Sequence, residues 1–166
     1  MRNKIPTRDP IGTEQRRNRA QRRIGPGSKC AQCGEARPEA LIAHSNPMIC
    51  AECQRRQKGH SVLDHHHGAG QANHDLTIPV PTNDHRAILT PAMYDWPKET
   101  RENPTGSPVL AAAACIRGFC DTAIYLIDKL IYWVADLLEA LHEVLVCEFG
   151  ENYWRVLKIR YTARRR

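Results

Sequence analysis

The longest regular pattern of apolar positions lies in the C-terminal third of the chain, between residues 109 and 148. Apolar side chains recur there at alternating spacings of four and three residues. This spacing is typical of a helix that buries one apolar stripe against a partner surface. Ser107 and Pro108 supply a helix N-cap and a proline at the first turn. The stripe consists of Ile116, Cys120, Ala123, Ile127, Leu130, Val134, Leu137, Leu141 and Val144.

The sequence leaves open which surface covers this stripe. A coiled-coil homodimer and an intramolecular helical hairpin both satisfy the pattern, and we favour self-association through residues 109–148. Cys115, Cys120 and Cys147 fall in the same segment, where we expect core residues and not metal ligands. We expect no membrane contact, because the chain has no run of about 18 uncharged apolar residues.

Composition divides the chain into four parts. Residues 1–29 predict a basic disordered arm, and residues 151–166 form a basic tail. Residues 98–150 hold a polar linker and the long amphipathic helix. Residues 30–97 hold the four closely paired cysteines and most of the histidines, so this part is expected to carry the chemistry.

The formal net charge of +6 is concentrated at the two ends of the chain. Residues 1–29 contain nine Lys/Arg against two acidic residues, and residues 154–166 contain six against none. Basic ends suggest contact with a polyanion, most simply the phosphates of nucleic acid, although such ends also serve as solubilising tails. The arginines expected to contact DNA are Arg16, Arg17, Arg19, Arg22 and Arg23, together with Arg86.

Four cysteines form two pairs, Cys30 with Cys33 and Cys50 with Cys53, and sixteen residues separate the pairs. A two-residue gap lets a tight turn direct two thiolates to one ion, and zinc prefers four such ligands in a tetrahedron. A redox role is less well supported, because C-x-x-C redox motifs occur singly. The pattern therefore predicts a structural Zn²⁺ site that helps residues 30–60 to fold.

A second concentration of polar residues follows the cysteines. Asp64 precedes three histidines at positions 65–67, and Asn83 and His85 follow a short apolar run. A neutral imidazole can deprotonate water near neutral pH, and a divalent cation can stabilise charge on a phosphate. The residue types indicate metal-assisted hydrolysis of a phosphodiester. A histidine run alone is also typical of a solvated patch that binds metal without catalysis.

The segment HHGAGQANHDLTIPVPTNDHR resembles the HNH (ββα-metal) endonuclease family. It is especially similar to the zinc-knuckle bacterial and phage subgroup with the pattern HHxAGRxN, TVxV, NxHR. The resemblance covers roughly residues 30–97. It implies a ββα-metal domain, a catalytic Mg²⁺, Mn²⁺ or other divalent ion, cleavage of duplex DNA, and the cytoplasm of a bacterial or phage-infected cell. Many relatives carry cysteines where this chain has Pro81 and Asp84.

The three histidines allow two alignments with the family motif. Alignment without a gap makes His66 the metal-side residue and His67 the general base, and we favour it. Alignment on the Asp-His pair makes Asp64 the metal ligand and His65 the base. Strand alternation groups Asp64 with His66, and His65 with His67, on opposite faces. In either alignment the resemblance implies His85 as a metal ligand and Asn83 as the motif's asparagine, which would hold the turn or the base imidazole or bind the ion.

The sequence thus predicts an α+β fold: a small zinc-stapled ββα-metal (HNH-like) domain followed by a long C-terminal helical segment. The predicted function is a metal-dependent DNA endonuclease with a histidine general base and one divalent ion. The alternative is a non-catalytic zinc-containing module that binds nucleic acid and oligomerises through its helix.

Overall fold

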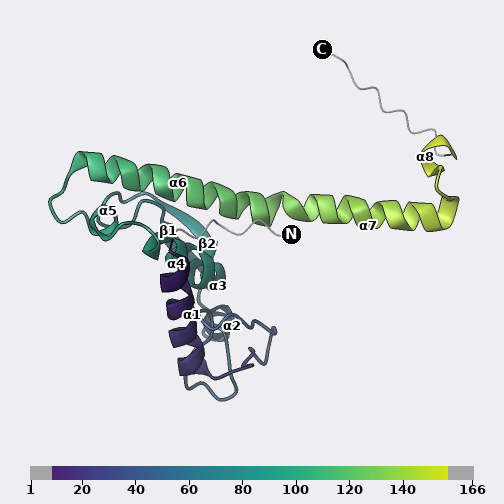
Figure 1. Cartoon of the computed structure of the whole chain (residues 1–166). Coiled ribbons are helices and arrows are strands. Elements are labelled where there is room, and N and C mark those ends of the chain that lie inside the picture. The colour runs from purple at the N-terminus through teal and green to yellow at the C-terminus, as the bar shows by residue number, and fades with distance from the viewer. Residues whose placement is uncertain (1–8, 157–166) are drawn as a thin grey trace, which may run out of the picture. The chain divides into compact units, whose positions relative to one another are not determined.

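The computed structural model describes residues 9–156, and Figure 1 shows the order of its elements. The described chain combines helices with one two-stranded sheet and a cluster of four cysteines, which confirms the α+β class. It divides into two compact units, of which the first ends at Tyr125 and the second begins at Leu126.

The first unit contains every strand and all but the last helices of the described chain. Its elements are α1 (Pro10–Ile24), α2 (Ala51–Gln57), β1 (Leu63–His67), β2 (Thr77–Pro81), α3 (Thr82–Asp84), the π-helix η1 (His85–Leu89), α4 (Thr90–Tyr94), α5 (Lys98–Glu102) and most of α6 (Pro108–Leu130). The second unit contains the end of α6, α7 (Tyr132–Phe149) and α8 (Tyr153–Val156).

Helix α1 corrects the prediction of a disordered arm over residues 1–29, because residues 10–24 are helical. The Asp9 side chain caps the helix by accepting a hydrogen bond from the Gly12 amide at 2.9 Å, and Pro10 occupies its first turn. Arginine and glutamine, which are good helix formers, fill most of its body. Asp95 anchors the helix, since it accepts a hydrogen bond from Thr13 at 2.9 Å and pairs with Arg16.

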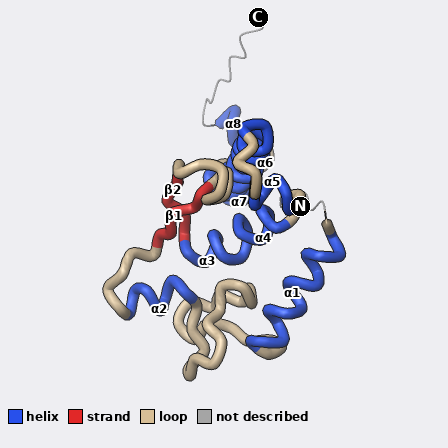
Figure 2. Tube along the Cα trace, turned by 90° about the vertical axis from the view of Figure 1, so that its left-hand side faces the viewer, coloured by secondary structure: helices blue, strands red, loops and turns tan. Residues whose placement is uncertain are grey.

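The sheet and the helical segment after it position the candidate site. Strands β1 and β2 are antiparallel, with Asp64 opposite Val80 and His66 opposite Ile78 (Figure 2). The chain leaves β2 at Pro81 and continues directly through α3, η1 and α4. His85 therefore begins η1 one short helix after the sheet. Within the described first unit the order of elements around the site is strand, strand, helix.

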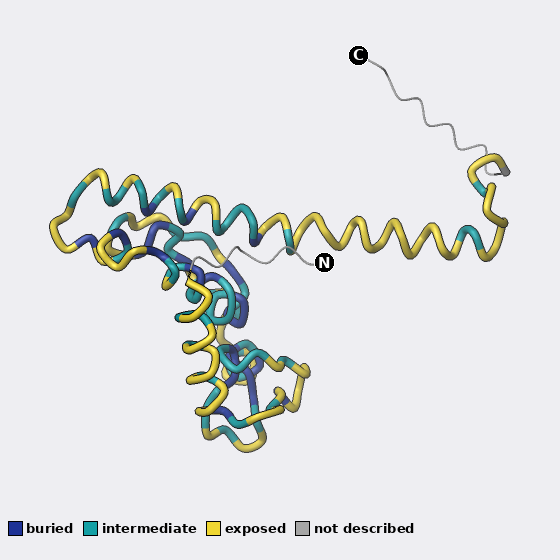
Figure 3. The backbone as a smooth tube through the Cα atoms, viewed as in Figure 1, coloured by how far each residue is buried: buried dark blue, intermediate teal, exposed yellow. Residues whose placement is uncertain are grey.

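The core of the first unit consists of three small clusters, and its buried segments are dark blue in Figure 3. One surrounds the cysteines and contains Leu41 and Ile49. The other two pack against α6. The cluster members there are Ala69, Trp96 and Ala114 in one, and Val80, Leu89 and Tyr125 in the other. The α6 helix thus covers the loop between the strands and one side of the sheet.

The face of α6 that packs in the first unit is not the predicted apolar stripe. Ala114, Gly118 and Tyr125 are buried, whereas Ile116 is 66% exposed and Cys120 is also exposed. Small residues occupy the packed face of α6 because the helix lies close to the loop after β1. The expectation that all three late cysteines are core residues is also wrong, since Cys115 is half-buried but Cys120 and Cys147 are exposed.

The predicted single helix over residues 109–148 is divided at Ile131 into α6 and α7. In the second unit the side chains of α7 are largely exposed, and none is buried. Taken together, the helical segment Pro108–Phe149 is long and apolar enough to cross a membrane by length and composition. A helix packed in a soluble protein can meet the same criterion, so this property alone is weak support for a membrane span.

Candidate functional site

The four predicted zinc ligands lie together. Cys30 and Cys33 flank a turn, while Cys50 is the N-cap of α2 and Cys53 lies in its first turn. Their sulfur atoms all lie within 4.8 Å of one another, and the sulfurs of Cys33 and Cys50 are 3.6 Å apart. Tetrahedral zinc with bonds of about 2.3 Å places its sulfurs about 3.8 Å apart. The cluster therefore has the composition and spacing of a zinc site.

The thiols of this cluster differ in how readily they ionise. Burial raises the pKa of Cys30, but backbone amides of Cys33, Cys50 and Gln32 outweigh it and lower the pKa to about 6. Burial and the neighbouring cysteine side chains raise the pKa of Cys53. Four thiolates this close repel one another unless a cation lies between them. The arrangement fits a Zn²⁺ ion, which would hold all four in the ionised form.

Asn83 belongs to the surroundings of the cysteine cluster. Its side-chain amide donates to the Cys50 sulfur at 3.3 Å, and its oxygen accepts from the Glu52 amide at 3.2 Å. Its backbone amide donates to the Glu52 carboxylate at 2.9 Å. In the described chain its other side-chain partner is Glu35. Among the described residues these contacts fit a role in holding the turn, and none of them is with the histidine run.

Asp64, His66 and His85 lie together on one side of the sheet. The Nδ1 atom of His85 is 3.2 Å from an Asp64 carboxylate oxygen. The rings of His66 and His85 meet edge to face, with centroids 5.2 Å apart. Across the described residues, only the four cysteines place all ligand atoms of a group within 4.8 Å. The Asp64, His66 and His85 group is more open than the zinc cluster.

His66 is the buried member of this group, with 2% of its surface exposed. Burial, followed by the charges of His85 and His67, lowers its pKa to about 4, so the ring is neutral at pH 7. Its Nδ1 atom is buried without a hydrogen-bond partner. A buried nitrogen without a partner carries an energetic cost that a bound cation would remove. A cation between β1 and η1 would provide the missing partner.

His65 and His67 lie on the opposite face of β1 from His66, as strand alternation predicts. His65 is exposed, and its Nδ1 atom is 3.4 Å from the Thr77 hydroxyl. His67 is half-buried. Each alignment with the family motif assigns only one of Asp64 and His66 to the metal, whereas the structure places both beside His85.

Arg55 is a site residue that the sequence did not reveal. Its guanidinium pairs with Asp64 at 2.6 Å and donates to the backbone carbonyls of Ser61 and Leu63, each at 3.2 Å. No motif marks this residue, since it lies on the zinc-segment helix α2 and reaches β1 only in the folded chain. The one sequence feature that could have marked Arg55 is its position two residues after Cys53, a predicted zinc ligand.

The predicted DNA-contacting arginines separate into two groups. Arg16 is engaged in anchoring α1, because it pairs with Asp95 and lies over the Tyr94 ring at 6.0 Å. The others on α1 are exposed and available to a partner: Arg17, Arg19, Arg22 and Arg23. Arg86 is half-buried next to His85. The basic tail beyond residue 156 lies outside the described residues.

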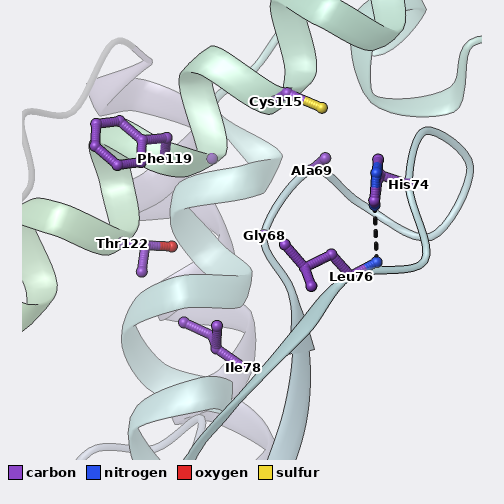
Figure 4. Close-up of a pocket in the computed structure, with 9 residues that line it drawn as sticks. Gly68, Ala69, His74, Leu76, Ile78, Cys115, Phe119 and Thr122 are labelled. Atoms are coloured by element: carbon purple, nitrogen blue, oxygen red, sulfur yellow. Dashed lines mark hydrogen bonds between the residues drawn. The ribbon is translucent and has the colours of Figure 1, made fainter.

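A separate apolar cavity of about 240 Å³ lies between the β1–β2 loop and α6. Figure 4 shows Phe119 and Thr122 on α6 and Leu76 and Ile78 among the residues that line it. His74 closes one end, where its Nδ1 atom accepts a hydrogen bond from the Leu76 amide at 2.9 Å. None of the residues lining this cavity belongs to the zinc cluster or to the Asp64, His66 and His85 group.

Comparison with family models, with curated proteins and with solved structures found no match to this chain. The resemblance to HNH endonucleases therefore rests on the motif residues alone. The geometry of the two sites provides the physical basis for a proposal.

Proposed function

We propose that this chain is a metal-dependent DNA endonuclease of the HNH type, built on a zinc-stapled ββα-metal domain. One observation carries the proposal: Asp64 and His66 from β1 meet His85 from the helix after β2, and the buried Nδ1 atom of His66 has no partner. Carboxylate and imidazole together suit a divalent ion that must also accept phosphate oxygens.

The hydrogen bond between Asp64 and His85 orients the imidazole. Without an ion, the His85 Nδ1 atom donates to the ionised Asp64 carboxylate. A divalent ion held by His85 and Asp64 together would take the place of this proton. His66 is neutral for the reason given above, which leaves one of its ring nitrogens with a lone pair. His66 and His85 would hold the ion, with Asp64 as a third ligand. When bound, Mg²⁺ or Mn²⁺ supplies positive charge that stabilises the phosphate and the leaving oxygen.

The general base in this proposal is His67, as the family resemblance implies. It ends β1 on the face opposite His66, so the attacking water would reach its imidazole around the end of the strand. Asn83 has a positioning role: by binding Cys50 and Glu52 it fixes the start of α3 and thus the place where His85 enters the site. Of the roles that the resemblance implies for the asparagine, this one corresponds to holding the turn.

A plasmid-nicking assay tests the proposal. Purified protein with Mg²⁺ or Mn²⁺ should nick plasmid DNA, and chelation should stop it until Mg²⁺ or Mn²⁺, but not Zn²⁺, is restored. His67→Ala should lower the rate at least about a hundredfold, as loss of a general base does. His65→Ala is the matched control because His65 is on the same strand face and exposed. An inactive His65→Ala with an active His67→Ala would reverse the roles.

The alternative function is a non-catalytic zinc-containing module that binds nucleic acid and oligomerises. The net charge of +6 and the exposed arginines of α1 favour nucleic-acid binding in either case. Salt-sensitive binding of duplex DNA without nicking under any divalent ion would select this alternative.

We also propose that two chains associate through residues 109–148. Two active sites in one particle would suit cleavage of both strands of a duplex. The cytoplasm of a bacterial or phage-infected cell is the setting that the family resemblance implies, and we retain it as part of the proposal.

A further inference from the structure

Three arginines from separate elements lie near one another, and one of them binds Asp64. Arg55 comes from α2 and binds Asp64 directly at 2.6 Å. Arg86 comes from η1, immediately after His85. Arg23 comes from the last turn of α1, and its charge and that of Arg55 both act on Arg86. Arg55 thus binds a carboxylate that the proposed metal site also requires, and the charges of Asp64, Arg55 and Arg23 all act on Arg86.

Of the three arginines, Arg86 has the positive charge that the surrounding residues balance least. It is half-buried, and within the described chain it has neither a hydrogen bond nor an ion pair. A partly buried cation among like charges is unfavourable unless an anion joins it. A phosphodiester would supply that anion, because guanidinium groups bind phosphate oxygens in a planar, often bidentate geometry.

Arg55 and a divalent ion compete for the same carboxylate. The two oxygens of Asp64 are bound by Arg55 and His85 in the structure. A cation bound to Asp64 would repel the Arg55 guanidinium and remove its partner. Arg55 is about one-third exposed, so its side chain can turn towards solvent and a substrate.

We propose that Arg23, Arg55 and Arg86 form a clamp for backbone phosphates of duplex DNA, and that Arg55 exchanges Asp64 for a DNA phosphate when a divalent ion binds that carboxylate. The inference rests on the proposed function only for the position of the cation, and it makes no use of cleavage. It predicts that one substitution, Arg55→Gln, has opposite effects on the two ligands.

The first measurement is Mn²⁺ binding by calorimetry to the zinc-loaded full chain without DNA. Arg55→Gln removes the competitor for Asp64, so Mn²⁺ should bind about two- to fivefold more tightly, as expected for a partly exposed ion pair. Arg55→Lys keeps the charge and should return the affinity towards that of the unsubstituted chain. Arg86→Gln is not expected to tighten Mn²⁺ binding to the same degree, because Arg86 does not pair with Asp64.

The second measurement is binding of a duplex of about 20 base pairs in the His67→Ala background with Mn²⁺, over a series of salt concentrations. Arg23→Gln, Arg55→Gln and Arg86→Gln should each weaken binding severalfold and reduce the salt dependence by about one phosphate contact. Lys98→Gln, which removes one exposed charge on α5, is the matched control and should change little.

Two results would overturn the inference. If Arg55→Gln weakens both Mn²⁺ and DNA binding, Arg55 only maintains the structure and there is no exchange. If Arg23→Gln and Arg86→Gln bind DNA as Lys98→Gln does, the clamp does not exist. Failure of the endonuclease proposal is distinguishable from failure of this inference. An unsubstituted chain that does not nick DNA would still show both binding effects if the inference is right.

Discussion

The hydroxyl of Tyr125 donates a hydrogen bond to the Asp84 carboxylate at 3.0 Å. Arg37 donates to the other oxygen of Asp84 at 2.7 Å. Tyr125 belongs to α6, Arg37 lies between the two cysteine pairs, and Asp84 directly precedes His85. One buried carboxylate therefore connects the covering helix and the zinc segment to the helical turn that carries the proposed metal ligand.

We predict that Tyr125→Phe destabilises the protein by about 2 kcal/mol, because it removes a buried hydrogen bond to a charged group. Burial and the charge of Asp84 raise the pKa of Tyr125 above its usual value. The unfolded chain therefore releases the phenol proton first as the pH rises, so stability falls above about pH 10. Urea denaturation at pH 7 and above pH 10 measures both effects.

The Phe variant should lose the part of this alkaline destabilisation that Tyr125 causes. Tyr94→Phe is the matched control, since Tyr94 is exposed and its ring contact with Arg101 does not involve the hydroxyl. Equal stability of Tyr125→Phe and Tyr94→Phe would contradict a structural role for the Asp84 contact.

Gly118 is where α6 approaches the loop after β1 most closely. A Cβ at this position would lie 1.7 Å from the Gly68 carbonyl oxygen. Helix propensity alone predicts that Gly118→Ala stabilises the helix by about 1 kcal/mol. We expect the opposite, a loss of at least about 2 kcal/mol, because backbone must move apart. Ala112→Gly, at an exposed position of the same helix, should cost only about 1 kcal/mol.

This contact also shows why the sequence could not reveal the packed face of α6. The heptad stripe is a property of neighbouring positions and is visible in the sequence. The fit of Gly118 against Gly68 depends on the path of the 49 residues between them, so it appears only in the fold. The Asp84 contacts were missed for the same reason, since Arg37 and Tyr125 are distant from it in sequence. Arg55 is close to Asp64 in sequence, but their pairing depends on how the chain turns between α2 and β1.

Short-range spacing, in contrast, predicted the parts of the sites that depend on local geometry. The two-residue cysteine gaps placed the four thiols together. The period of two in a strand put Asp64 and His66 on one face. The helix over residues 10–24 was missed because its arginines were interpreted only as charges. Its Asp9 cap and Pro10 were available as helix signals.

Zinc is expected at one ion per chain, resistant to mild chelation. Cys50→Ser should abolish tight zinc binding, because it removes one of four ligands and disturbs the sulfur that Asn83 binds. Elemental analysis after gel filtration measures the content. Cys120→Ser, at an exposed cysteine outside the cluster, should retain the full zinc content. Full zinc content in Cys50→Ser would argue against a four-cysteine site.

Self-association through the C-terminal helix makes a further prediction. Within the second unit every apolar stripe position from Ile127 to Val144 is at least 38% exposed, so the described unit leaves the stripe uncovered. A second copy would cover it, and sedimentation equilibrium should then give a dimer.

Replacing Leu137 and Leu141 together by glutamate should give a monomer, because each chain would carry two charges into the contact. Glu139→Gln changes charge outside the stripe and should leave the dimer intact. If the unsubstituted chain is monomeric and sediments with lipid vesicles, the stripe contacts a membrane and not a second copy. The length and apolar composition of Pro108–Phe149 would allow this contact.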